Sequence, residues 1–91
     1  MSSVEELKLK SSEILERNKN LAIDLSKNIL SEPETGYKEF KTNKKIYDAL
    51  NSLGLQVQNN LAITGLMTTI YGDQPGPHVA VIGELDGLPV P

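Results

Sequence analysis

The sequence predicts an α/β fold in which two helices precede three strands. Apolar residues recur at helical spacing over the first 30 positions and again over residues 38–53, which indicates two amphipathic helices. Short β-branched and apolar runs follow, separated by Gly and Pro, as is typical of strands and turns. The last run, residues 79–83, is apolar on both faces, and such a strand needs a neighbour on each side. The sequence therefore predicts an unfinished sheet.

The first helix is expected to begin after Ser3, because Glu6 stands three residues later, in the spacing of a capping box. Pro33 is expected to end this helix, since a proline disfavours helical backbone in the residue before it. One apolar stripe should run between these limits, formed by Leu7, Ile14, Leu15, Leu21, Ala22, Leu25 and Ile29.

The second helix is expected over residues 38–53, with Gly54 in the left-handed conformation just after its last turn. Its inward face should carry Phe40, Ile46, Ala49, Leu50 and Leu53.

Three strands are expected after the second helix. Residues 55–58 alternate apolar with polar, as a half-buried strand does, and residues 65–71 form a β-branched run. Residues 72–77 are rich in Gly, Pro and Asp, which favour turns. The sequence thus predicts an antiparallel hairpin that joins residues 65–71 to residues 79–83.

Composition limits the partners and the chemistry. The chain has 91 residues and a net charge of −3, which argues against nucleic acid or an anionic membrane as a partner. It has no Cys, so disulfides, thiolate zinc sites and a Cys nucleophile are excluded within it. No leader sequence and no apolar stretch of the roughly 18 residues needed for a membrane span is recognisable, and a cytoplasmic location is expected.

Two carboxylates follow the last predicted strand. Glu84 and Asp86 are two residues apart, so in extended backbone they share a face, where they could bind a cation, share a proton or orient a histidine. The alternative is that both are polar residues of an exposed turn. His78, the only histidine, lies at the other end of the strand, about 15 Å away, and is expected to be a solvated loop residue.

A second group of carboxylates surrounds Pro33. Residues 32–39 contain three Glu side chains, but they lack the alternating oxygen ligands of a calcium loop. A solvated helix end, with Glu39 near the start of the second helix, explains them more simply.

Several short motifs occur in an order that resembles a known family. They are Ser31-Glu32-Pro33-Glu34-Thr35-Gly36-Tyr37, Glu39 with Thr42, Leu50 to Gly54, Thr64-Gly65, Tyr71-Gly72 with Pro75-Gly76-Pro77, and Gly83-Glu84-Leu85-Asp86-Gly87-Leu88-Pro89. This set is similar to the N-terminal portion of the zinc-dependent aminoacylase and carboxypeptidase family, and within it to the amidohydrolase branch that includes indole-acetyl-amino-acid hydrolases and aminobenzoyl-glutamate hydrolase subunits.

The resemblance implies a domain organisation. Members are several times longer, with a mixed-sheet catalytic domain that is interrupted by a smaller dimerisation domain. Residues 1–91 would then be the N-terminal part of a single catalytic domain, truncated before the rest of that domain and the dimerisation domain. A homodimer would be possible only with the missing domain.

The resemblance also implies a chemistry. Members use two divalent metal ions, usually zinc, to hydrolyse the amide bond of N-acyl amino acids or short peptides. Their metal ligands lie in later segments, so no metal ligand is assigned here, no metal should bind this chain tightly, and the chain alone should be inactive. Asp86 matches an active-site carboxylate that orients a ligand. Glu84 matches a position that is commonly a His ligand in the wider family, so it is the second catalytic candidate.

Two further interpretations remain open. The chain could be a small non-catalytic module whose last strand offers its edge to a partner. It could also be a truncated gene product.

Overall fold

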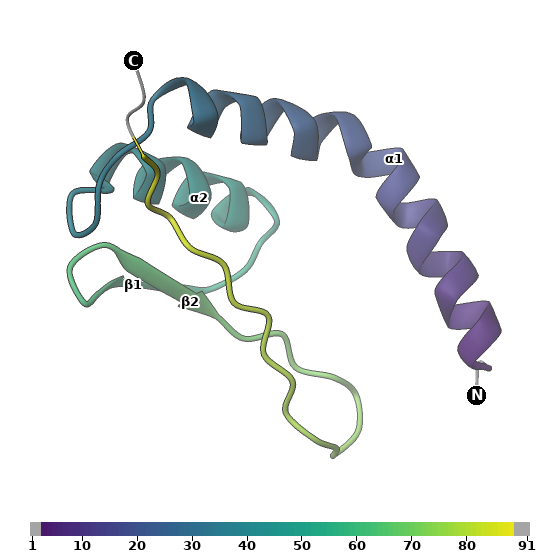
Figure 1. Cartoon of the computed structure of the whole chain (residues 1–91). Helices are drawn as coiled ribbons and strands as arrows, with labels where there is room; N and C mark the ends of the chain where they lie inside the picture. The colour runs from purple at the N-terminus through teal and green to yellow at the C-terminus, as the bar shows by residue number, and fades with distance from the viewer. Residues whose placement is uncertain (1–2, 89–91) are drawn as a thin grey trace.

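The computed structural model describes residues 3–88, which form two helices followed by a two-stranded antiparallel sheet (Figure 1). Helix α1 spans Val4–Ser31 and helix α2 spans Phe40–Ser52. Strand β1 spans Val57–Leu61 and strand β2 spans Gly65–Thr68. The α/β class is therefore confirmed, with helices first and strands second.

Both ends of α1 follow the predicted signals. The hydroxyl of Ser3 accepts a hydrogen bond from the N–H of Glu6 at 3.1 Å, and the helix ends at Ser31, just before Glu32 and Pro33. The apolar stripe is less well covered than expected. Leu25 and Ile29 are half-buried, but the stripe nearer the N-terminus is exposed. Figure 1 shows why, because this half of α1 extends away from α2 and the sheet.

Helix α2 ends as predicted, since Gly54 has a φ of +78° just beyond it and donates its N–H to the carbonyl of Asn51 at 3.0 Å. Its predicted inward face is only partly correct. Ile46, Ala49 and Leu50 are half-buried, whereas Phe40 and Leu53 are 61% and 67% exposed. These two residues lie at opposite ends of α2, and no neighbour within residues 3–88 covers them.

The predicted hairpin between residues 65–71 and 79–83 is wrong, because β2 pairs with β1 instead. Val57 lies opposite Thr68, and Leu61 lies opposite Gly65 across a three-residue turn. Closing so short a loop costs less entropy than closing the longer connection from residue 69 to residue 78. The first strand is accordingly displaced from residues 55–58 to residues 57–61.

The expected third strand is also absent from the described part of the chain. Residues 79–83 have no ladder partner, and Val79, Val81 and Ile82 are 87%, 98% and 89% exposed. A strand is defined by hydrogen bonds to a neighbour, so an apolar extended segment without one is not a strand.

The side chains that are buried within residues 3–88 are polar. They are Glu39, Thr42 and Thr64, and no hydrophobic side chain of this range is fully buried. The side-chain amide of Asn43 connects α2 to the β1–β2 hairpin. It donates to the side-chain oxygen of Asn59 at 2.8 Å and to the carbonyl of Thr64 at 2.7 Å. No helix in the described range has the length and apolar character needed to cross a membrane.

We predict that Gly54→Ala destabilises the chain by about 1 kcal/mol, because a side chain in left-handed backbone is strained even where space is open. Gly36→Ala is the matched control, since Gly36 also has open space around it but no positive φ. Urea unfolding followed by far-UV circular dichroism measures both. Equal stability of the two variants would contradict the prediction.

Candidate active site

The 84–88 segment lies against the turn between α1 and α2 (Figure 1). The N–H of Gly87 donates to the carbonyl oxygen of Glu34 at 2.8 Å. A Cβ added to Gly87 would lie 3.0 Å from the Cβ of Pro33, so the two backbones approach as closely as a glycine allows. A cavity of about 320 Å³ adjoins this contact, lined by Ser26, Ile29, Leu30, Pro33, Leu85, Asp86 and Gly87.

The two candidate catalytic carboxylates lie on the outer face of this segment. Glu84 and Asp86 are exposed while Leu85 and Gly87 are half-buried, the alternation expected of extended backbone. Within residues 3–88, neither carboxylate has a hydrogen bond or an ion pair to a protein group. His78 is exposed in the preceding segment, as expected. Pro89, the last residue of the predicted motif, lies outside the described residues.

The carboxylate of Glu34 caps the start of α2. One oxygen accepts from the N–H and the hydroxyl of Thr42 at 2.6 and 2.7 Å, and the other accepts from the N–H of Lys41 at 3.2 Å. Burial alone would raise the pKa of Glu34, but the hydrogen bonds from Thr42 and Lys41 outweigh it and hold the pKa below its ordinary value. Folding therefore favours the ionised form of this carboxylate, which suits the positive end of the helix dipole.

Glu32 links the two helices more loosely. Its carboxylate pairs with Lys41 at 3.1 Å and with Lys45 at 3.5 Å, and these contacts, chiefly the hydrogen bond from Lys41, lower the pKa of Glu32. The ammonium of Lys45 also donates to the carbonyl of Asn28 near the end of α1 at 3.1 Å. An exposed pair such as Glu32 with Lys41 contributes little to stability.

Glu39 does not behave as a solvated helix end. It is the N-cap residue of α2 but makes no side-chain cap, and it is only 8% exposed with one oxygen, Oε1, unpartnered. Glu34 occupies the capping role that position alone would have given to Glu39. The sequence signal for a cap is an acidic residue shortly before a helix begins. Glu32, Glu34 and Glu39 all precede α2, so this signal could not single out Glu34.

The described residues do not form a metal site. No three His, Asp or Glu side chains between residues 3 and 88 come together in a way that could hold an ion. The carboxylate of Glu34 is engaged by the N–H groups of Lys41 and Thr42 and by the hydroxyl of Thr42.

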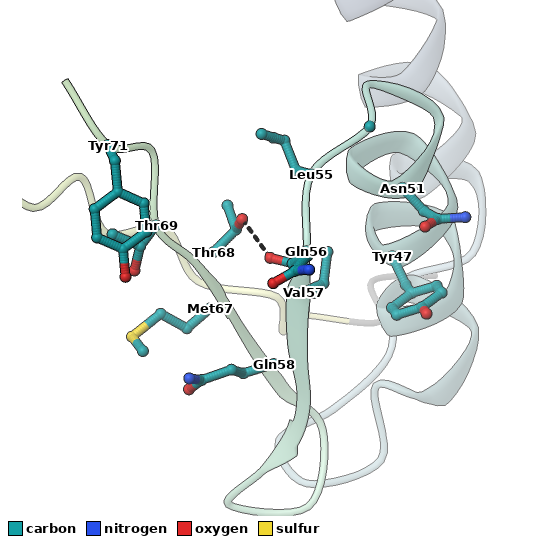
Figure 2. Close-up of a pocket in the computed structure, with 11 residues that line it drawn as sticks. Tyr47, Asn51, Leu55, Gln56, Val57, Gln58, Met67, Thr68, Thr69 and Tyr71 are labelled. Carbon is teal, nitrogen blue, oxygen red and sulfur yellow. Dashed lines mark hydrogen bonds between the residues drawn. The ribbon is translucent and has the colours of Figure 1, made fainter. Parts of the chain in front are cut away.

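A larger cavity of about 630 Å³ lies between α2 and the hairpin (Figure 2). Tyr47 and Tyr71 come from opposite sides of it, and Thr68 donates its hydroxyl to the carbonyl of Gln56 at 2.7 Å on its wall. Its lining has no carboxylate and no histidine, so it lacks a group that exchanges protons near neutral pH. Nothing in the sequence pattern indicated this cavity.

We predict that acid weakens the start of α2 through Glu34. A carboxylate whose pKa is lowered by folding adds stability above its unfolded pKa, and that stability is lost as the pH falls through the folded pKa. Glu34→Gln should remove this part of the acid dependence, as measured by helical circular dichroism during an acid titration. Glu13→Gln, at an exposed position of α1, is the control, and an unaltered titration in Glu34→Gln would contradict the assignment.

Comparisons with known proteins show that the chain is similar to several hydrolases. The chain is 34% identical over 91 residues to thermostable carboxypeptidase 2 of Saccharolobus solfataricus, covering 99% of this chain and 22% of the relative. It is 31% identical over 68 residues to an IAA-amino acid hydrolase of Arabidopsis thaliana, covering 75% of this chain and 15% of the relative. It is 34% identical over 58 residues to the N-acyl-L-amino acid amidohydrolase of Geobacillus stearothermophilus, covering 64% of this chain and 16% of the relative.

The chain thus spans about a fifth or less of the length of these relatives. No family model and no solved structure matches it. The relatives are nevertheless hydrolases by name, and the similarity to the carboxypeptidase covers 99% of this chain. The chain belongs to the aminoacylase and carboxypeptidase family of amidohydrolases and peptidases.

Proposed function

We propose that this chain forms part of the catalytic unit of an amidohydrolase that cleaves the amide bond of N-acyl amino acids or short peptides, with Asp86 as an active-site carboxylate. The observation that carries the proposal is the position of Asp86. It stands on the exposed face of a segment that is hydrogen-bonded to the α1–α2 turn, in a chain whose relatives include a carboxypeptidase and an amidohydrolase.

The chemistry of the reaction explains why a free carboxylate is useful there. Hydrolysis of an amide needs a group that activates water and a group that polarises the carbonyl. Asp86 has no protein partner within residues 3–88, so its oxygens are available to accept a hydrogen bond from a metal-bound histidine or from the reacting water. Glu84 lies about 7 Å along the same face, where it could accept a proton.

The described residues do not supply the rest of the machinery. Since they form no metal site, the divalent ions of the proposed reaction would be held by residues outside the 3–88 range. The names of the relatives support the substrate class, because they are a carboxypeptidase, an IAA-amino acid hydrolase and an N-acyl-L-amino acid amidohydrolase.

One observation favours a second function, that of a small interaction module. Val79, Val81 and Ile82 are almost fully exposed, and an apolar extended segment can add to the edge of a partner's sheet. Cooperative unfolding of a monomer would favour the module. Partial folding or self-association would favour the hydrolase segment, because its apolar surfaces would then lack their neighbours.

We predict that the 91-residue chain alone shows no hydrolysis of N-acetyl amino acids when zinc or manganese is added. Residues 3–88 form no group of side chains that could hold the ions, and added metal ions cannot replace such a group. Turnover above a blank that contains only the metal would contradict the prediction.

A chimaera tests the role of Asp86. The chain would replace the matching segment of the Saccharolobus carboxypeptidase, and release of the amino acid from N-acyl amino acids and short peptides would be measured. We expect the chimaera to be active and Asp86→Asn to lower its kcat by about 10–100-fold or more, as loss of a carboxylate that orients a ligand does.

Asp73→Asn is the matched control for that experiment, because Asp73 is an exposed carboxylate in the 72–77 turn. Its activity should equal that of the parent chimaera. An Asp86→Asn chimaera as active as the parent would contradict the assignment, and so would an inactive chimaera whose parent carboxypeptidase is active.

A further inference from the structure

We propose that Glu34 is a positioning residue for Asp86, acting through the backbone of Gly87. The inference rests on the proposed function for its catalytic consequence, but its structural half stands on contacts within this chain. Glu34 accepts hydrogen bonds through both its side chain and its backbone. Its carboxylate is held by the start of α2, and its carbonyl oxygen holds the segment that carries Asp86.

The contact between the Glu34 carboxylate and Thr42 is strong and shielded from solvent. Thr42 is 1% exposed, and both its N–H and its hydroxyl reach the same oxygen of Glu34, at 2.6 and 2.7 Å. Hydrogen bonds to an ionised carboxylate are stronger than those between neutral groups. The side chain of Glu34 is therefore fixed relative to α2.

The backbone carbonyl of Glu34 makes the second contact, which attaches residues 69–88 to the rest of the described chain. Within residues 3–88, the bond from Gly87 N–H to Glu34 is the only one that joins residues 69–88 to the rest of the chain. Pro33 restricts the backbone just before Glu34, and its ring lies against Gly87. The position of Asp86, one residue from Gly87, thus depends on where Glu34 directs its carbonyl.

Glu32 shows what distinguishes this role from general support. It lies two residues away and also links to α2, through Lys41 and Lys45, but within residues 3–88 it has no hydrogen bond or ion pair to the 84–88 segment. A purely structural tie between the helices would make Glu32 and Glu34 similar. If Glu34 positions Asp86, only the substitution of Glu34 should change the position of Asp86.

The first test is amide hydrogen exchange by NMR on the 91-residue chain. The Gly87 amide should exchange about tenfold more slowly than the Gly83 amide, which has no hydrogen-bond partner within the described residues. Glu34→Ala and Thr42→Val should abolish this protection, whereas Thr42→Ser, which keeps a hydroxyl, and Glu32→Gln should retain it. A Gly87 amide as fast as Gly83 in the unmodified chain, or full protection in Glu34→Ala, overturns the proposal.

A second variant guards against simple loss of folding. Gly87→Ala pushes the segment away from Pro33 without touching α2, so the amide of residue 87 should lose protection while the Thr42 amide keeps it. Loss of protection at both amides in Gly87→Ala would mean that the two sides form one structural unit, and this result overturns the directional role of Glu34.

The second test separates positioning from stability in the chimaera. Glu34→Ala and Gly87→Ala should lower kcat by a similar factor, about tenfold or more, with KM little changed, and Glu32→Gln should match the parent. Unchanged kcat in the folded Glu34→Ala chimaera overturns the positioning role. An inactive parent chimaera or a neutral Asp86→Asn rejects the proposed function instead, and the exchange result then decides the structural half by itself.

Discussion

The arrangement of this chain depends on the contact between the carboxylate of Glu34 and the first turn of α2. That contact satisfies two backbone N–H groups that a helix start leaves without partners, and it adds the buried hydroxyl of Thr42. Because Glu34 also accepts the N–H of Gly87, the same residue fixes the turn after α1, the start of α2 and the segment that bears Asp86. The start of α2 and the 84–88 segment therefore meet at one residue, the first at its carboxylate and the second at its backbone carbonyl.

Polar contacts hold these segments together because little apolar surface is buried within residues 3–88. No hydrophobic side chain there is fully buried, and the α2–hairpin contact relies on the amide of Asn43. A neutral hydrogen bond contributes only about 0.5–1.5 kcal/mol, while ordering each residue costs about 1–2 kcal/mol in backbone entropy. The exposed stripe of α1 and residues 79–82 are therefore surfaces whose burial would add stability. That fits a chain that spans 22% of the length of a carboxypeptidase relative.

The proposed active-site carboxylates lie in the least supported part of the structure. Residues 69–83 have no hydrogen bond to the rest of the described chain, and the next bond of this kind is the one from Gly87 to Glu34. Segments with few buried contacts open most easily, so a carboxylate there needs a local anchor if it is to act at a defined point. The close approach of Gly87 to Pro33 provides a steric limit on one side of that anchor.

Local signals in the sequence determined both helices, the Ser3 cap, the stop before Pro33 and the left-handed Gly54, because each depends on residues within one or two turns. The ordered motifs also sufficed to identify the family. Tertiary structure alone decided that β2 pairs with β1, since the competing pairing had the stronger strand pattern but the longer loop. It alone decided that residues 79–83 lack a partner and that Glu34, rather than Glu39, caps α2. The contact from Glu34 to Gly87 joins positions far apart in the chain, and no local periodicity encodes such a contact.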